Sequence, residues 1–167
     1  LDPLSAMINY NLGLARTNVG RFSDAQASFG RAIEIDPNLA VAYVHIGNVS
    51  AYGLGRLDTA IPWYEKAAEL DPGSPEVLSR PIIAHWELGD DVGAGQWLSQ
   101  LLALGEGTAF SNLVASLVYL ERRDELSARR HAQLAAELDP WTLFLIRDHD
   151  LRKGDYVTAR ERYAKAF

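Results

Sequence analysis

Asp148-His149-Asp150 is the cluster with the clearest potential for chemistry, because carboxylates and an imidazole are ligands that metal ions accept. On a helix, however, consecutive side chains point about 100° apart, so these three cannot converge on one ion. No two of the chain's four histidines have the i, i+4 spacing of a helical metal site. We therefore predict no metal site and interpret the cluster as a solvated or capping group.

Three short stretches match part of a known functional motif, but their sequence context does not support the function. Gly53-Leu54-Gly55 and Gly105-Glu106-Gly107 have the glycine spacing of phosphate loops, but no predicted strand precedes them and neither continues into the required lysine or third glycine. Asn48-Val49-Ser50 reads as a glycosylation sequon, yet it falls inside a predicted helix. No serine, histidine and acid arrangement can be proposed from spacing. The sequence therefore predicts no catalytic residues, no enzyme activity and no cofactor.

Composition narrows the classes of partner. The 167 residues carry a net charge of -6, with acidic and basic residues interleaved, which argues against nucleic acid and against an anionic membrane surface. No apolar run approaches the length of a membrane span. The absence of cysteine excludes disulfides and cysteine-ligated zinc. It leaves the compartment open, with the cytoplasm favoured over the periplasm.

A repeated unit of about 34 residues organises the chain. Residues 20–38, GRFSDAQASFGRAIEIDPN, return as residues 55–73, GRLDTAIPWYEKAAELDPG. Positions four and seven residues after the first alanine of each copy lie on one helical face, so each segment is predicted to be an amphipathic helix. The aligned alanines, spaced by 35, 34, 34 and 31 residues, are Ala25, Ala60, Ala94, Ala128 and Ala159.

Glycine and proline mark the predicted helix boundaries. A glycine, or Arg123 in one unit, stands five residues before each aligned alanine and is predicted to make a left-handed turn between two helices. Ser23 is predicted to cap the next helix together with Gln26. Asp-Pro pairs are predicted to end the second helices, because the residue before proline avoids the helical region. These pairs are Asp36-Pro37, Asp71-Pro72 and Asp139-Pro140.

Two positions depart from the regular pattern. Tyr52-Gly53-Leu54 contains one extra residue before Gly55, which predicts a widened turn. Pro81 is predicted to interrupt the first helix of the third unit. Each unit is otherwise helix, tight turn, helix, and such a hairpin must stack on others to bury its apolar face.

These units resemble the tetratricopeptide repeat. The residues that carry the resemblance are Leu12-Gly13, Gly20, Ala25, Phe29, Ala32 and Pro37, followed by Ile46-Gly47, Gly55, Ala60, Tyr64, Ala67 and Pro72. The resemblance implies an all-α fold, an α-solenoid of antiparallel helix hairpins with about five repeats, the last incomplete. We expect a single array over residues 1–167, cut from a longer chain. The abundance of arginine and alanine indicates a bacterial origin. The expected repeats are 6–39, 40–74, 75–108, 109–140 and 141–167.

The resemblance also implies a working surface. In this family the first helices of successive repeats line a concave groove that holds peptide segments or helices, so the implied function is a non-catalytic scaffold for a protein or peptide partner. Transfer of the groove positions to this chain gives Tyr10, Asn11, Leu14, Val44, His45, Asn48, Arg80, Ile83, Trp86 and Phe110. Only Arg80 matches the charged clamp with which some members bind acidic chaperone tails, which argues against that specialised role.

Two alternatives stay open at this point. Trp63 and Trp97 occupy equivalent places on successive second helices, where they either form a convex ridge that docks another domain or another copy of the chain, or lie flat over their neighbours. The array could also be a regulatory or sensor segment of a multidomain bacterial transcription regulator or nucleotide cyclase.

Overall fold

A computed structural model describes residues 3–105 and 108–139 of the chain, and these residues are helical with no strand among them. None of the helices in this part of the chain is long and apolar enough to cross a membrane. The elements are α1 (Pro3–Asn18), α2 (Phe22–Ile35), α3 (Ala40–Asn48), the π-helical η1 (Val49–Gly53), the short 3-10 turn η2 (Asp58–Ala60), α4 (Ile61–Leu70), α5 (Pro75–Glu87), α6 (Asp91–Ala103), α7 (Ala109–Glu121) and α8 (Glu125–Leu138).

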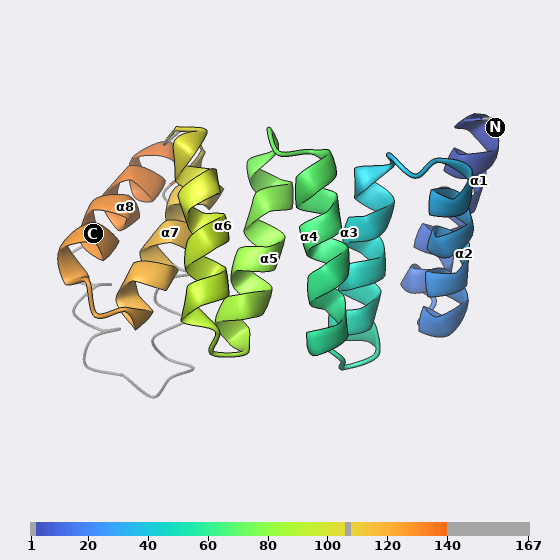
Figure 1. The fold of residues 1–167 in the computed structure, drawn as a ribbon, viewed down its shortest axis with the longest axis horizontal. Coiled ribbons are helices and arrows are strands. Elements are labelled where there is room, and N and C mark those ends of the chain that lie inside the picture. The colour runs from blue at the N-terminus through green and yellow to red at the C-terminus, as the bar shows by residue number, and fades with distance from the viewer. Residues whose placement is uncertain (1–2, 106–107, 140–167) are drawn as a thin grey trace. The chain divides into compact units, whose positions relative to one another are not determined.

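The chain divides into two compact units, with the boundary after Trp97 inside α6. In unit 1, α1 packs against α2, α2 against α3, α3 against α4 and α4 against α5. In unit 2, α7 packs against α8. Figure 1 shows consecutive helices within each unit running in opposite directions. The prediction of an all-α fold built from antiparallel helix hairpins is confirmed. The expected fifth repeat, 141–167, lies outside the described residues, as does Asp148-His149-Asp150.

The turns inside the hairpins follow the prediction from glycine spacing. Gly20, Gly55 and Gly89 have φ of 74°, 66° and 76°. The equivalent Arg123 has φ of 57°, the only positive φ of a non-glycine residue in the described part of the chain. Glycine adopts this region freely, whereas a residue with a Cβ is strained there. The fold therefore imposes the same left-handed turn on all four hairpins, whichever residue occupies it.

This strain predicts that Arg123→Gly raises the free energy of unfolding by about 0.5–1 kcal/mol, because relief of the left-handed strain outweighs the greater backbone entropy of glycine in the unfolded chain. Urea unfolding followed by circular dichroism measures the change. Arg129→Gly is the matched control, because Arg129 is exposed on α8. There the same substitution should cost about 1 kcal/mol. Equal destabilisation by both changes contradicts the assigned turn.

Asp-Pro pairs end the second helices as predicted. α2 ends at Ile35, α4 at Leu70 and α8 at Leu138. The aspartate that follows each helix has non-helical dihedral angles, for example φ -127° and ψ 93° at Asp36. The cap predicted at Ser23 is wrong, because α2 begins at Phe22 and its N-cap makes no side-chain hydrogen bond.

Pro81 does not interrupt its helix, contrary to the prediction. α5 runs continuously from Pro75 to Glu87 with Pro81 inside it. The Pro81 side chain is fully buried, and its neighbours Leu78 and Ile82 are buried as well. Tertiary packing of an apolar face supplies most helical stability in proteins, so it compensates for the hydrogen bond that proline cannot donate. An N-cap also stabilises α5, since the Ser74 side chain accepts a hydrogen bond from the Val77 amide at 3.3 Å.

In the core of unit 1, an aromatic ring on the second helix of each of the first two repeats packs against a glycine of the first helix. A Cβ added to Gly13 would lie 2.5 Å from the Phe29 ring, and one added to Gly47 would overlap the Tyr64 ring. Both rings are buried. The two contacts explain why the leucine-glycine and isoleucine-glycine pairs recur in the sequence: only a residue without a side chain admits the ring at this distance.

The extra residue of the second repeat lies in η1 rather than in a widened turn. Gly13 and Phe29 are 16 residues apart, whereas Gly47 and Tyr64 are 17 apart. The Leu54 amide donates to the Val49 carbonyl at 2.9 Å, five residues back, which is the hydrogen bond of a π-helix. The single π-helical turn takes up the additional residue, so the glycine and the ring still meet.

Candidate functional site

A pocket of about 340 Å³ opens on unit 1. This volume is at the lower end of those in which proteins hold ligands. Its lining comes from α1, α2, α3, η1 and α5, and consists of Thr17, Phe22, His45, Asn48, Val49, Tyr52, Gly53 and Arg80. Three first helices of consecutive repeats thus contribute to one concavity.

His45, Asn48 and Arg80, which the family resemblance had placed among the groove positions, all line this pocket. His45 and Asn48 lie on α3, one turn apart, and therefore point from the same helical face. Arg80 stands 35 residues after His45, at the equivalent position of α5. The periodicity of the repeat brings these polar groups together, although about one repeat length separates Arg80 from His45 and Asn48 in the sequence.

Aromatic contacts hold His45 in place. Its ring stacks on Phe29 of α2 with centroids 5.4 Å apart, and meets the edge of Tyr10 of α1 at 5.5 Å. Burial, with a smaller contribution from the positive charge of Arg80, lowers the pKa of His45 below its ordinary value. The imidazole is therefore neutral near pH 7 and can both donate and accept hydrogen bonds.

A hydrogen bond from the buried Tyr64 holds the side chain of Asn48 in place. The Tyr64 hydroxyl donates to Asn48 Oδ1 at 2.9 Å. Burial is the main cause that raises the pKa of Tyr64, so this hydroxyl stays protonated and keeps donating. Because the acceptor oxygen is engaged, the amide nitrogen of Asn48 is the group that it can offer to a ligand.

Arg80 is the cation of the pocket. Its side chain is half-buried, and within residues 3–105 and 108–139 it forms no ion pair with a carboxylate. The pKa of Tyr52 is raised, mainly by burial and to a smaller extent by the negative charge of Glu87, and the positive charge of Arg80 opposes this rise. Glu87 and Arg80 therefore both lie close enough to Tyr52 to affect its pKa. A guanidinium that is partly desolvated and lacks a carboxylate favours an anionic group in the pocket.

The transfer of groove positions, which also gave Thr17, missed four lining residues, namely Phe22, Val49, Tyr52 and Gly53. Val49, Tyr52 and Gly53 belong to η1, whose extra residue was the one available signal. π-helical turns occur frequently at functional sites because they displace side chains from the regular helical positions. A Cβ on Gly53 would lie 2.6 Å from Phe22, so the absence of a side chain there lets η1 approach the start of α2. Gln26 of α2 also donates to Ser50 at 3.1 Å, which ties η1 to the same helix.

The remaining residues predicted for the groove have other surroundings. Tyr10 and Leu14 are half-buried and pack against the core cluster that contains Phe29. Asn11 is exposed. Phe110 belongs to unit 2, where it packs against the cluster of Leu113 and Ala135. Three residues are half-buried in unit 1 without lining the pocket, namely Val44, Ile83 and Trp86.

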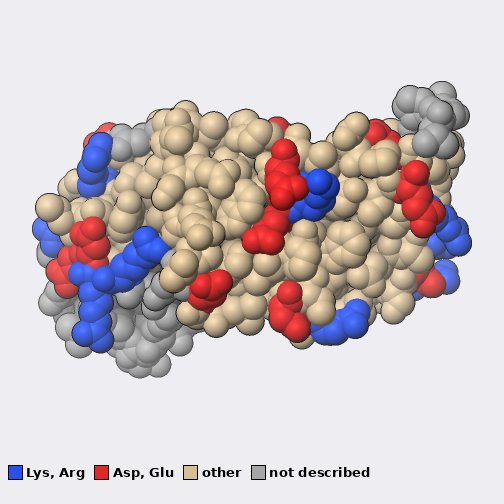
Figure 2. All heavy atoms as spheres, viewed as in Figure 1, with Lys and Arg blue, Asp and Glu red and all other residues tan. Residues whose placement is uncertain are grey.

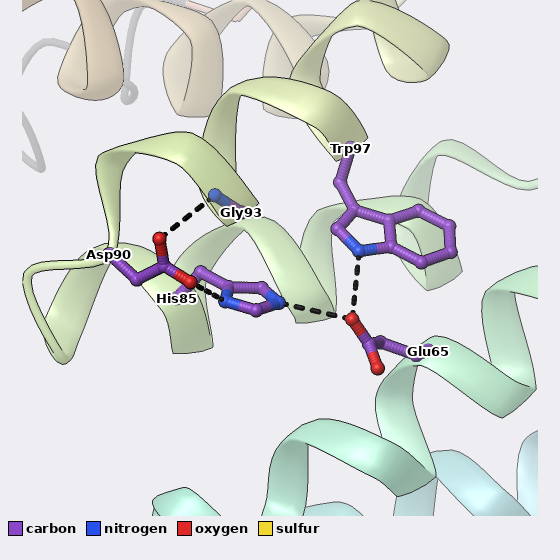
Figure 3. A network of polar contacts seen from close by, with 5 residues as sticks. All are labelled: Glu65, His85, Asp90, Gly93 and Trp97. Atoms are coloured by element: carbon purple, nitrogen blue, oxygen red, sulfur yellow. Dashed lines mark hydrogen bonds and ion pairs between the residues drawn. The ribbon is translucent and has the colours of Figure 1, made fainter.

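Trp63 and Trp97, the candidates for a convex ridge, are both half-buried. Trp63 lies against Tyr43 of α3, with ring centroids 6.2 Å apart. Figure 3 shows Trp97 directed at Glu65 of α4, to which its indole nitrogen donates at 3.3 Å. Trp63 therefore covers part of its own hairpin and Trp97 part of the preceding one, and a docking role for the remaining exposed surface stays a prediction.

The hydrogen bonds around Trp97 connect three helices. Figure 3 shows the ring of His85, on α5, between Glu65 of α4 and Asp90 before α6. The distances are 3.2 Å from His85 Nε2 to Glu65 and 2.8 Å from Nδ1 to Asp90. A hydrogen bond from the Gly93 amide, followed by the one with His85, lowers the pKa of Asp90. These contacts tie the third hairpin to the second, within unit 1.

The face of the molecule drawn in Figure 2 carries scattered charges. Lys and Arg side chains of the described residues lie mostly beside Asp and Glu, and they form no continuous basic stripe across this face. Among the described residues, no group of three or more His, Asp or Glu side chains is arranged to hold a metal ion. The pocket offers hydrogen bonds, a positive charge and apolar surface, which suit recognition of a ligand.

Comparison with known sequences identifies the repeats. The sequence model described as "Tetratricopeptide repeat" matches residues 7–39 and again 40–74. Residues 7–74 are two tetratricopeptide repeats. The "Small glutamine-rich tetratricopeptide repeat-containing protein 2" of Mycosarcoma maydis is 32% identical over 87 residues, which are 52% of this chain and 24% of that protein. The chain thus spans about a quarter of the length of this relative.

Solved structures with a similar fold cover nearly the whole chain. The crystal structure of MamA matches with a TM-score of 0.73 and 21% identity, over 97% of this chain and 90% of that one. A chain of the APC/C hetero-tetramer Cut9-Hcn1 matches with a TM-score of 0.75 and 22% identity, over 98% and 33%. YrrB, described as a TPR protein with an unusual peptide-binding site, matches with a TM-score of 0.69 and 20% identity, over 96% and 84%. At these identities the likeness concerns the fold, an α-solenoid of helix hairpins.

Proposed function

We propose that this chain is a protein-interaction scaffold whose unit 1 binds a peptide segment of a partner through the pocket around His45, Asn48 and Arg80. The observation that carries the proposal is the concavity to which three consecutive first helices contribute. The peptide-binding site named in the description of YrrB, a protein of the same fold, is consistent with it. Aromatic rings beside fixed polar groups supply contact area at low entropic cost together with orientation.

The chemistry of the pocket suggests what kind of peptide it accepts. We propose a segment with an aspartate or glutamate that pairs with Arg80, next to an apolar side chain that contacts Tyr52 and Val49. Tyr52 is exposed at the pocket while Val49 is buried beneath it. Asn48 is positioned to donate to the backbone of an extended peptide. The pocket volume suits one or two side chains, so the rest of the segment would lie along the surface of the first helices.

Selection from a displayed library of random 12-residue peptides, with the full chain as bait, tests this proposal. We expect the enriched peptides to contain an acidic residue near an apolar one. Arg80→Gln should weaken their binding about tenfold to hundredfold, since a charge-assisted hydrogen bond contributes on the order of 1.5–3 kcal/mol. Fluorescence polarisation with the labelled peptides measures the change.

Arg31→Gln is the matched control, because Arg31 is exposed on α2 and does not line the pocket. It removes the same charge from the acidic chain, so it isolates the position of Arg80 from net charge. Circular dichroism of both variants checks that the helices persist. Enriched peptides that bind the two variants equally well would refute a role for Arg80, and enrichment without any acidic residue would refute the proposed ligand class.

A further inference from the structure

α1 exposes a row of apolar side chains that its sister helices bury. Ile8 and Leu12 are 66% and 39% exposed, and Ala15, one turn later, is exposed as well. Positions at i, i+4 and i+7 lie on one face of a helix, so the three residues form a continuous stripe. Isolated exposed apolar residues need no explanation, but an aligned row on the outer side of a hairpin does.

The repeat itself supplies the reference for this row. The equivalent residues 34 positions later are Ala42 and Ile46 of α3 and Val49 at the start of η1, and all are at most 2% exposed. In α5 the equivalents, 35 positions further on, are Val77, Pro81 and Ala84, which are also buried. The same face of the same kind of helix is therefore buried twice in unit 1 and exposed once.

The structure also shows what covers this face. Ile46 of α3 and Val49 of η1 share a core cluster with Ala25 and Phe29 of α2, the second helix of the preceding repeat. Ala84 of α5 packs with Ala60 of η2 and Tyr64 of α4, which begin the second half of the second repeat. The covering element is each time an amphipathic helix with an alanine and, four residues later, an aromatic ring.

We propose that the face of α1 formed by Ile8, Leu12 and Ala15 binds the second helix of one more tetratricopeptide repeat. This helix packs on α1 as α2 packs on α3. The stripe then packs as in α3 and α5, because a repeat hairpin buries its apolar face only against a neighbour. The sequence at the start of α1 fits this occupant. Leu1-Asp2-Pro3 repeats Ile35-Asp36-Pro37 and Leu70-Asp71-Pro72, in which the residue before aspartate closes a second helix.

The test adds such a helix and asks whether α1 recognises it. A copy of residues 5–34, one complete hairpin, is joined directly before Leu1, so that Leu1 stands where Ile35 follows Glu34 in the natural repeat. We expect the extended chain to melt several degrees higher than the natural chain, because stacked repeats stabilise one another. Hydrogen exchange by mass spectrometry should show slower exchange in the segment around Leu12.

Substitution of the stripe separates specific packing from a general effect of length. In the natural chain Ile8→Glu should change the melting temperature little, because the side chain is already exposed. In the extended chain, with the change made only in the original α1, the same substitution should abolish most of the gain. Met7→Glu is the control that should be tolerated in both chains, because Met7 is exposed and its equivalent in α3, Val41, stays exposed although α3 is covered.

Two outcomes would overturn the proposal. One is an extended chain in which Ile8→Glu is as harmless as in the natural chain, since the added helix is then not seated on the stripe. The other is a natural chain that forms dimers by light scattering and loses them on Ile8→Glu, because a second copy is then the occupant. Neither outcome depends on the peptide-binding proposal, because Ile8, Leu12 and Ala15 do not line the pocket around Arg80.

Discussion

Replacing Phe29 with alanine is expected to lower the free energy of unfolding by about 3–5 kcal/mol, the usual cost of deleting a large aromatic ring from a core. Phe29 is 0% exposed, its ring packs on Gly13, and it stacks on His45. The cavity left behind is bounded by helical backbone on the α1 side, which cannot collapse into it. The free energy of unfolding of a small domain is about 5–15 kcal/mol in total, so this change removes a large part of the stability of unit 1. Urea unfolding monitored by far-ultraviolet circular dichroism measures it.

Phe29→Leu is the companion variant, because leucine keeps apolar volume at the same position. We expect it to cost less than half as much as alanine. Leucine cannot stack on His45, so the variant should still loosen one wall of the pocket, and binding of any selected peptide should weaken more than stability suggests. If alanine and leucine at this position are equally well tolerated, the ring does not fill the core as described.

Gly47→Ala is expected to cost about 1–3 kcal/mol, although alanine is the better helix former by about 1 kcal/mol. The new Cβ overlaps the Tyr64 ring, which is buried and anchored by its hydroxyl to Asn48. Relief requires the ring to move within a packed core and to weaken that hydrogen bond. Thermal unfolding should therefore shift down by several degrees.

Gly30→Ala is the matched control for this effect. Gly30 lies inside α2, and a Cβ there has no atom within 4 Å. The same substitution should therefore stabilise the chain by about 0.5–1 kcal/mol. A double-mutant cycle with Tyr64→Leu sharpens the test, since Gly47→Ala should cost much less once the ring is gone. Equal costs with and without the ring would show that the clash is not the cause.

The helices were predictable where one residue type decides the local geometry. The left-handed turns at Gly20, Gly55 and Gly89 follow from spacing, because glycine at this point of a hairpin has a specific conformational use. The ends at the Asp-Pro pairs follow in the same way. Pro81 was misjudged because its own backbone preference opposes a helix, while burial of its face, which only the folded neighbours provide, decides the outcome.

The pocket was predictable in part, for a related reason. His45, Asn48 and Arg80 could be placed together because the period of the repeat carries equivalent positions onto adjacent helices. Tyr52 and Phe22 could not, because their positions depend on how the extra residue is accommodated. A loop or a π-helical turn satisfies the same sequence, and the choice rests on hydrogen bonds such as that from Leu54 to Val49. Likewise Gln26 bonds Ser50 rather than capping its own helix with Ser23.

The π-helical segment Val49–Gly53 has a consequence for how such arrays diversify. It acts as a local phase correction, because it takes up one added residue at the end of α3 while the contact between Gly47 and the Tyr64 ring is kept. A single inserted residue can therefore change which side chains line a cavity of a solenoid, while the contacts that hold the hairpin together are kept.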